Sequence, residues 1–518
     1  MAVPADPIID EEEEVEDGGP AHHPYAPSHE FFDLSTTVDP SYIISLIRKL
    51  LPLDSASRST YSEVASENPN RGEEDEGDAP SVSVSNEENV KSSRNKSENM
   101  DVDVSAEFSR GECEGTDVSV GESAWEEYGC VLWDLAASKT HAELMVDNLI
   151  LEVLLANLLV CKSARVTEIS IGIIGNLACH EVPMKHIIST KGLIEIIIDK
   201  LFLDDPQCLY EACRLLTAGL QSGESITWAE ALQSEHVLCQ ILWIAENTLN
   251  HQLLDKIMGL ILVVLESQQK VMEALLLPMM KLGLANILIS LLTFEISKLT
   301  SERIPERYSI LDLILRAIEA LSVLDDHSQE ICSSTGLFQL ICDLVKFPDK
   351  VEVGNCCVTA AVLIANMLSD VPDHALRISQ DLTLLGGLLD IFPFASDDVE
   401  ARNAVWNVIA RILVRIQESE MSPSRVHHCI MVLVEKHDLI EDELLSQRVE
   451  SGDEQHSLCS PGSAANARNV SLGMIISILN KWTAEKENAK NNRNAEVPVS
   501  ESDVKRLLDC CNKFFNYN

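Results

Sequence analysis

The chain has 518 residues and carries 83 acidic against 39 basic side chains, which gives a net charge of -44 at pH 7. Because Lys and Arg are what attract proteins to phosphate backbones and anionic membranes, this balance argues against direct nucleic-acid binding and against membrane attachment. Basic proteins are the natural electrostatic partners of such a chain. Hydrophobic residues make up 46% of the sequence and aromatic residues only 5%, a mixture that suits stacked helices better than a β-rich core.

The N-terminal residues 1–124 are unusually acidic, with 29 acidic and 8 basic side chains and a net charge of -21. Acidic runs occupy residues 10–17 and 73–78, and a Ser/Asn/Glu-rich stretch follows over residues 81–99. A segment of this composition cannot bury enough apolar area to offset the entropy of ordering. We therefore predict a mostly disordered acidic tail.

One short segment of this tail differs from the rest. Residues 40–52 follow Asp39, have a helical apolar pattern and end at Pro52. A helix this short needs a partner for its apolar face. Two alternatives are open: it docks onto the folded part of the chain as an N-terminal cap, or it serves as a recognition helix for another protein.

From Trp125 onward, an apolar phrase recurs about every 45 residues. The clearest copy covers residues 168–179, and weaker copies lie at 212–220, 310–321, 358–368 and 404–413. Each copy is a helix too apolar to stand alone, so it must stack on its neighbours, which is the signature of an armadillo or HEAT-like α-solenoid. We predict an all-α solenoid with armadillo-like repeats over residues 125–445, a flexible linker at 446–466 and capping helices over 467–518, the last of them a terminal helix over residues 501–515.

The repeats contain a second phrase, in which a glycine precedes an apolar helix. Gly192, Gly283, Gly336 and Gly386 hold this place, and a glycine there allows a tight turn between helices. We interpret the first phrase as the long third helix of each repeat and expect acidic residues just before it to complement the helix dipole. The first two helices of the folded part are expected at residues 126–135 and 142–159. A charged loop is expected at residues 297–308.

Several pieces of the sequence, in the same order, resemble the serum amyloid A-like protein 1 family. They are residues 130–135, 167–179, 204–206 leading into 214–216, and 228–233. The acidic N-terminus with one short apolar helix near Tyr42 also fits. The resemblance covers residues 125–270 and implies an intracellular armadillo-like protein found in or around the nucleus and loosely linked to proliferation. It implies no catalytic residues, and the family name does not imply a secreted or amyloid protein.

Three groups of residues invite a chemical interpretation. Residues 427–429 (His-His-Cys) point in different directions on a helix, so they cannot all face one metal ion. The adjacent pairs Cys356-Cys357 and Cys510-Cys511 lack the two-residue gap of zinc ribbons, and Cys179-His180 has no third catalytic partner in the sequence. Because phosphate loops and nucleophile elbows are also absent from the sequence, we expect no enzyme, no metal and no cofactor.

The third helices are the candidate binding surface. Armadillo proteins of the importin-α type bind basic peptides through a ladder of Asn and Trp on these helices. Our candidate protein-binding residues are Asn176, Arg214, Trp228, Asn366 and Trp406. The intervening ladder positions are Gly219, Val264 and Ala320, which cannot bond a peptide backbone with a side chain. A folded or helical partner is therefore favoured over regular capture of a basic peptide, and a salt bridge to a neighbouring acidic loop is the structural alternative for Arg214.

Two functions follow. The first is an adaptor or scaffold that holds a protein partner of unknown identity in the groove of the solenoid. The second is an acidic chaperone or transport factor whose tail shields basic cargo proteins. The fifteen Cys fit a reducing compartment and the N-terminus has no secretory signal. We therefore expect the protein in the nucleus, the cytoplasm or both, with residues 486–493 as a thin candidate for a basic import cluster.

Overall fold

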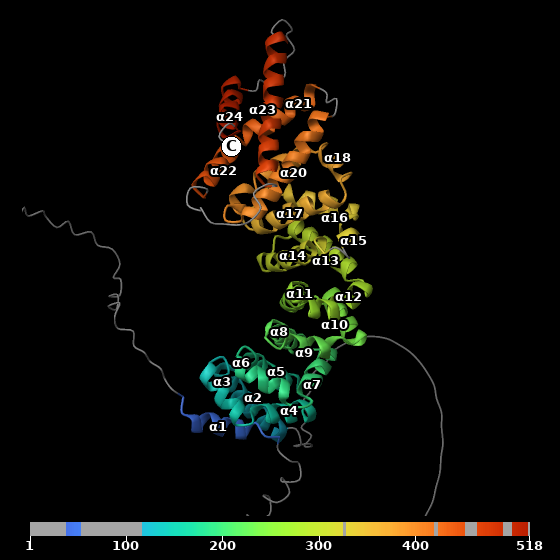
Figure 1. The fold of residues 1–518 in the computed structure, drawn as a ribbon. Helices are drawn as coiled ribbons and strands as arrows, with labels where there is room; N and C mark the ends of the chain where they lie inside the picture. Colours follow the sequence, from blue (N-terminus) through green and yellow to red (C-terminus); the bar gives the residue numbers. More distant parts are fainter. Residues whose placement is uncertain are drawn as a thin grey trace, which may run out of the picture.

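The computed structural model describes residues 38–52, 116–324, 328–418, 423–450, 464–489 and 500–515. Throughout these residues the secondary structure is helical, and the helices follow one another in a single elongated stack (Figure 1). Most of the predicted tail disorder and most of the predicted linker fall outside the described residues. The tail prediction is wrong for residues 116–124, which are helical: the first helix of the folded part runs Thr116–Leu135 and begins at residue 116 instead of residue 126. The all-α solenoid predicted from the recurring phrase is confirmed.

The described helices form seven three-helix units with one or two helices at each end. The first helices are α3 (Lys139–Asp147), α6 (Glu181–Ser189), α9 (Ser225–Leu232), α12 (Gln269–Lys281), α15 (Ser328–Cys332), α18 (His374–Ile378) and α21 (Pro423–Glu435). The second helices are α4 (Ile150–Val160), α7 (Leu193–Asp199), α10 (Glu235–Asn247), α13 (Leu284–Ser301), α16 (Thr335–Val345), α19 (Leu382–Leu389) and α22 (His437–Glu450). Short 3-10 turns η2 (Lys200–Phe202), η3 (Pro305–Arg307) and η4 (Phe392–Ala395) lie between second and third helices.

The third helices form the spine of the molecule. They are α5 (Ala164–Ala178), α8 (Pro206–Gln221), α11 (His251–Glu266), α14 (Tyr308–Ser322), α17 (Gly354–Asp370), α20 (Val399–Glu418) and α23 (Ala464–Ala489). Each packs on the third helix of the next unit, and α2 (Thr116–Leu135) packs on α5 as the first rung. This ladder of neighbouring helices is the armadillo-like arrangement that the repeat predicts.

Polar residues just before the third helices start them by capping. The Asp205 carboxylate accepts hydrogen bonds from the backbone N–H groups of residues 207 and 208, and Pro206 takes the first position of α8. Asp398 accepts from the N–H of Ala401 in α20 in the same way. Asp349 does not cap a helix: it pairs with Arg303 at 3.0 Å. The acidic residues before third helices therefore act as specific caps where the helix begins next to them.

The glycines of the second phrase have two different roles. Gly192 and Gly283 have φ of 83° and 95° and stand immediately before α7 and α13, as the tight-turn interpretation predicts. Gly336 and Gly386 lie inside α16 and α19 instead. The tight-turn prediction is wrong for these two positions, because their helices begin one residue or one turn earlier.

Other boundaries also differ from the sequence pattern. The expected helix over 142–159 is two helices, α3 and α4, which are separated at Leu149, whose φ is 64°. The expected loop at 297–308 is mostly helical: α13 continues to Ser301, where Leu299 is buried, and Arg307 pairs with the buried carboxylate of Glu295. The sequence pattern did not predict that α13 extends to Ser301, because polar residues lie between its buried positions in this stretch.

The C-terminal part is organised differently from the predicted capping unit. Helix α23 packs along α20, as the third helix of a seventh unit, and spans 26 residues. The predicted linker 446–466 carries helix at both described ends, in α22 and α23. Helix α24 (Glu501–Phe515) matches the predicted terminal helix in its bounds and packs on α21, α22 and α23.

The other end of the stack is covered by α1 (Pro40–Lys49). Its apolar residues Ile43, Leu46 and Ile47 are buried. The carbonyl oxygen of Leu50 accepts hydrogen bonds from Nε1 of Trp125 (3.1 Å) and Nδ2 of Asn157 (2.7 Å). Helix α1 thus packs on the solenoid against α2 and α3, which is the first of the two alternatives stated above.

Helix α13 is, among the described helices, long and apolar enough to cross a membrane by length and composition alone. Half of the helix, Leu284–Ser301, is buried inside the solenoid, where α13 packs against α10, α14 and α16. The same composition is expected of a helix buried in the core of a repeat stack.

Candidate protein-binding face

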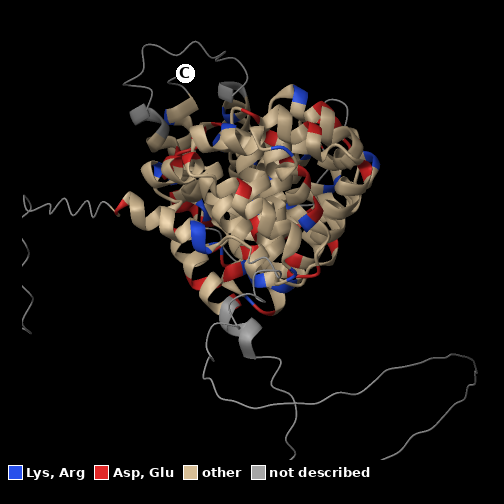
Figure 2. Cartoon of the chain, turned by 90° about the horizontal axis from the view of Figure 1, so that it is seen from below, with Lys and Arg blue, Asp and Glu red and all other residues tan. Residues whose placement is uncertain are grey.

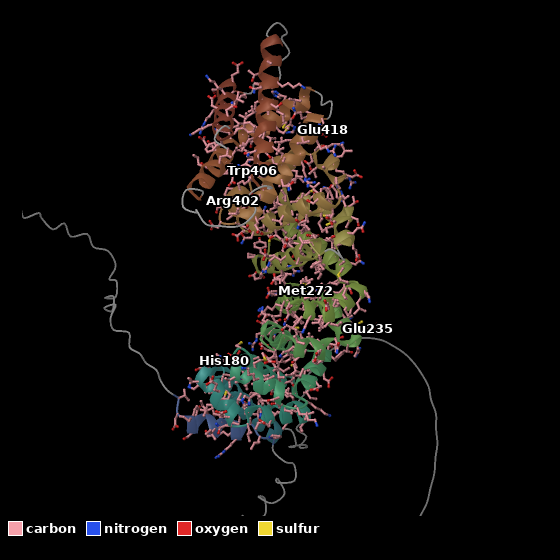
Figure 3. All side chains as sticks on the ribbon, viewed as in Figure 1. His180, Glu235, Met272, Arg402, Trp406 and Glu418 are labelled. Atoms are coloured by element: carbon pink, nitrogen blue, oxygen red, sulfur yellow. The ribbon has the colours of Figure 1, made fainter. Side chains whose placement is uncertain are left out.

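The third helices line the concave side of the stack. In Figure 1, α3 and α6 at one end and α22 at the other extend further to the left than α11, while α10 and α12 form the right-hand side. Figure 3 places His180 on this concave side and Glu235, at the start of α10, on the opposite convex side. We call the exposed side of the third helices α8, α11, α14, α17 and α20 the concave face.

At one end of this face, Arg214 and Asn176 join two neighbouring third helices. Nη1 of Arg214 donates to Oδ1 of Asn176 at 3.0 Å, and Nη2 donates to the carbonyl oxygen of Gly172 at 3.0 Å. Asn176 in turn donates from Nδ2 to the carbonyl oxygen of Trp133 in α2 at 2.8 Å. Two of the predicted site residues are therefore in direct contact, and together they tie α2, α5 and α8 into one rigid group.

The ion-pair partner of Arg214 is a residue that the sequence interpretation did not choose. Glu211, one turn earlier in α8, lies 2.7 Å from the guanidinium and has a side chain only 8% exposed. The neighbouring acidic loop expected as partner instead caps α8 through Asp205. Burial raises the pKa of the Glu211 carboxyl, and the charge and hydrogen bond of Arg214 oppose that rise.

Asn366 makes an equivalent link in the middle of the stack. Its Nδ2 donates to Oγ of Ser322 across the α14–α17 interface at 2.9 Å. In an armadillo protein that captures extended peptides, an asparagine at this place must be free to bond the peptide backbone. Here both Asn176 and Asn366 bond groups of the protein itself, so they serve first to hold adjacent third helices together.

Trp228 and Trp406 do not lie on the concave face. Both side chains are 0% exposed. Trp228 packs against Gly219, where an added Cβ would come within 2.6 Å of the indole. Trp406 packs on Phe392 and donates from Nε1 to Glu443 at 3.3 Å, and Figure 3 shows it in the C-terminal part of the stack beside Arg402. The expectation that these rings contact a partner conflicts with their burial, because they fill the space between helices.

The centre of the concave face combines a small apolar floor with charged residues. Gly259 of α11 has open space where a side chain would stand, and Val263 lies one turn further along the same helix. Arg316 of α14 pairs with Glu266 of α11 at 2.7 Å. Sequence reasoning missed this region, although a glycine inside the aliphatic run of residues 257–265 was a visible signal.

Partly buried carboxylates accompany this floor. Burial raises the pKa of Asp312 and of Glu319, while Arg316 lowers both and a hydrogen bond with Asn366 lowers that of Glu319. Arg316 pairs with Glu266, and Lys256 pairs with Asp255. Asp312 and Glu319 are additional carboxylates, so the acidic side chains outnumber the basic ones here. Acidic side chains are also spread over the rest of the solenoid, with Lys and Arg between them (Figure 2).

A hollow opens where the C-terminal ends of α5 and α8 meet the starts of α6 and α9. Its volume is about 670 Å³. Ala178, Met184 and Ala218 contribute apolar lining, and Glu181, Lys185 and Glu224 contribute charged lining. Lys185 pairs with Glu181 at 2.7 Å, whereas Glu224 forms no ion pair with any residue that the structure describes. We call this space the α5/α8 hollow.

Most of the cysteine and histidine residues that invited a chemical interpretation bond backbone carbonyl groups or are buried in the core. The thiol of Cys179 lies 3.4 Å from the carbonyl oxygen of Gly175, and Nε2 of His180 lies 3.2 Å from that of Ala136, so the two side chains engage different carbonyls. Burial raises the pKa of the Cys357 thiol to about 11 and that of Cys429 to about 12. Among the described residues, no group of three or more His, Cys, Asp or Glu side chains is placed to hold a metal ion.

Comparison with protein-family models gives no match. Among curated proteins, Protein saal1 of Danio rerio is 26% identical over 300 residues, which cover 54% of this chain and 62% of that protein. Protein SAAL1 of Homo sapiens is 27% identical over 238 residues, covering 41% of this chain and 48% of that protein. Protein saal1 of Xenopus tropicalis is 30% identical over 134 residues, covering 26% and 29%. The chain thus spans less than two thirds of the length of each of these relatives.

Solved structures similar to the chain include engineered repeat proteins. The designed armadillo repeat protein YIII(Dq)4CqI has a TM-score of 0.37 at 13% identity and covers 48% of this chain and 94% of that one. An engineered protein, structural genomics target OR497, has a TM-score of 0.40 at 15% identity and covers 78% and 97%. The curated relatives confirm the resemblance inferred from the sequence: the chain is similar to the serum amyloid A-like protein 1 family.

Proposed function

We propose that this protein is a non-enzymatic scaffold that holds a protein partner on the concave face of its solenoid. One observation carries the proposal: the third helices form a continuous, bowed ladder whose exposed side offers an apolar floor at Gly259 and Val263 between charged side chains. A concave surface built from rigid, stacked helices is the usual binding surface of repeat proteins. Binding on such a surface needs no moving parts and no reactive side chain.

The rigidity of the face supports this function. Side-chain hydrogen bonds join α5 to α8 through Arg214 and α14 to α17 through Asn366. A similar link joins α17 to α20, where Nη2 of Arg411 donates to Oγ of Ser369 at 3.3 Å. Because neighbouring units are fixed relative to one another before a partner arrives, less conformational entropy is lost on binding.

The non-enzymatic part of the proposal is supported by the side chains that could have reacted. The buried thiols have raised pKa values, for example about 12 for Cys213, so they are inert at neutral pH. Cys179 and His180 face different carbonyl groups. The free state of the described cysteines supports residence in a reducing compartment, the nucleus, the cytoplasm or both.

Quantitative affinity capture from cells tests the proposal, with full-length protein carrying a single added tryptophan on one face or the other. G259W places an indole on the open concave floor, and S290W places one at an exposed position of the second helix α13 as a matched control. The proposal expects G259W to lose the specific partner and S290W to retain it, with both variants unchanged in circular dichroism. Equal capture by both would refute the concave face as the binding surface.

A third variant distinguishes the scaffold from the second candidate function, an acidic chaperone or transport factor. Replacing the acidic residues of 10–17 and 73–78 by Asn and Gln removes much of the charge of the N-terminal segment and leaves the solenoid intact. A partner held by the concave face survives this change. Loss of basic partners with this variant alone would instead assign function to the acidic segment, as expected for a chaperone or transport factor of basic proteins.

A further inference from the structure

The α5/α8 hollow has a composition that fits one kind of side chain. Ala178, Met184 and Ala218 give it apolar walls, and its charged lining is net negative, with Glu181 and Glu224 against Lys185. Lys and Arg combine a long aliphatic stem with a charged head, so they match such a lining better than a purely apolar or purely polar group does. The volume of about 670 Å³ leaves ample room for one such side chain and part of its backbone.

Helix ends add to the negative potential of the hollow. Helix α5 ends at Ala178 and α8 ends at Gln221, and both of these residues line the hollow. The C-terminal end of a helix carries a partial negative charge and attracts cations. Lys185 lines the same hollow, pairs with Glu181 at 2.7 Å and is also attracted by the charge of Glu224, so one cation faces two carboxylates. Two helix ends and Glu224 therefore act together on whatever enters.

The hollow borders the concave side of the stack, where Figure 3 places its lining residue His180. Ala218 and Gln221 lie on α8, which packs directly against α11, the helix that carries Gly259 and Glu266. A partner segment that lies on the concave side can therefore place one side chain into the hollow. We propose that the α5/α8 hollow is the specificity pocket of the concave face and takes an arginine or lysine side chain from a basic segment of the partner protein. This inference rests on the proposed function and names the chemistry of the partner.

Two native thiols provide a site-specific test. Cys179 lines the hollow, and Cys239 is exposed on α10, a helix of the right-hand side in Figure 1. In full-length protein carrying G259C, the alkylation rate of three thiols is read by mass spectrometry: Cys179 in the hollow, the thiol introduced on the floor, and Cys239 as the control. The probe is an acetylated, amidated octapeptide of alternating Lys and Arg at physiological salt, compared with its Gln and citrulline counterpart.

The proposal expects the basic peptide to protect Cys179 and the thiol introduced by G259C while leaving Cys239 unchanged. It also expects E224Q to weaken protection of Cys179 by about fivefold, as loss of one partly buried charged contact predicts, E224D to restore most of it, and E230K, an exposed control on α9, to leave it unchanged. Protection at residue 259 without protection at Cys179 would overturn the pocket and leave the concave face standing. Equal protection of all three thiols would show general attraction to an acidic protein and overturn the pocket as well.

Discussion

Arg214 and Asn176 lie on neighbouring third helices and are joined by a 3.0 Å hydrogen bond from Nη1 to Oδ1. Asn176 passes the connection on to the carbonyl oxygen of Trp133 in α2. Two polar residues that the sequence suggested for partner binding thus fasten the N-terminal units to one another. Their first effect is on the stability of that end of the solenoid.

Replacing Asn176 by Ala is expected to cost about 1–3 kcal/mol, because the Arg214 guanidinium and the Trp133 carbonyl each lose a partner in a partly buried place. Hydrogen exchange of α2, α5 and α8 measures the local effect without assuming that the whole stack unfolds together. The matched control is N355A, an exposed asparagine on α17, which should change exchange little. Unchanged exchange in N176A would contradict the fastening role.

Replacing Arg214 by Met is expected to make stability depend on pH through Glu211. The pKa of Glu211 is already raised by burial, and loss of the opposing Arg214 raises it further. A carboxyl group whose pKa is raised in the folded state binds protons more strongly there than in the unfolded chain. Stability therefore falls as the pH rises from the ordinary carboxyl pKa, near 4.5, through the pKa of the folded state. The loss in melting temperature caused by R214M should therefore be larger at pH 7 than at pH 5.

The double variant R214M/E211Q is the control for this pH effect. Because glutamine cannot ionise, the difference between pH 5 and pH 7 should disappear even if the packing defect remains. A pH difference that persists in the double variant would show that another group is responsible.

Gly219 and Gly259 should respond in opposite ways to alanine. In G219A the added Cβ would stand 2.6 Å from the indole of buried Trp228, and such overpacking costs about 1–3 kcal/mol. In G259A the Cβ meets open space in the middle of α11, and the gain in helix propensity is about 1 kcal/mol. Thermal melts of the two variants measure the difference. Similar destabilisation by both changes would mean that the space at Gly259 is not open.

Helix α1 should act as a cap of the solenoid. In L46D a carboxylate is forced into a site where the native side chain is 1% exposed, and burial of an unpaired charge is costly. We expect faster hydrogen exchange in α2 to α4 and a lower melting temperature, with partner capture preserved. The control is Y42D on the outer side of the same helix, where the side chain is 48% exposed. Loss of the partner with an unchanged melting temperature would favour the recognition-helix alternative instead.

The sequence was sufficient to predict the stacked helices, because each third helix is too apolar to be stable alone and the phrase recurs at a regular spacing. Helix α24 is predicted in its bounds, since its apolar residues Val504, Leu507 and Cys511 follow one helical face. The break at Leu149 was not predictable, because a leucine at positive φ leaves no mark in a hydrophobic pattern. The extension of α13 was not predicted for a different reason: the polar residues on its exposed side resemble a charged loop.

The candidate site was less predictable for a different reason. Sequence alone does not tell whether a tryptophan on an apolar helix points inward, and both Trp228 and Trp406 do. The α5/α8 hollow is formed by residues from two helix ends and two loops, about 40 residues apart in the chain. Its net negative charge comes from Glu181 and Glu224 against Lys185, a grouping that is visible only in three dimensions.

The most direct test of the account is photocrosslinking in cells from three single positions of the full-length protein. A benzoyl-phenylalanine is placed at Gly259 on the concave floor, at Ser290 on α13, or at Ser85 in the acidic N-terminal segment. The account predicts a discrete crosslinked partner from position 259 and none from position 290. Crosslinks that form from position 290, or from position 85 alone, would contradict the claim that the concave face holds the partner.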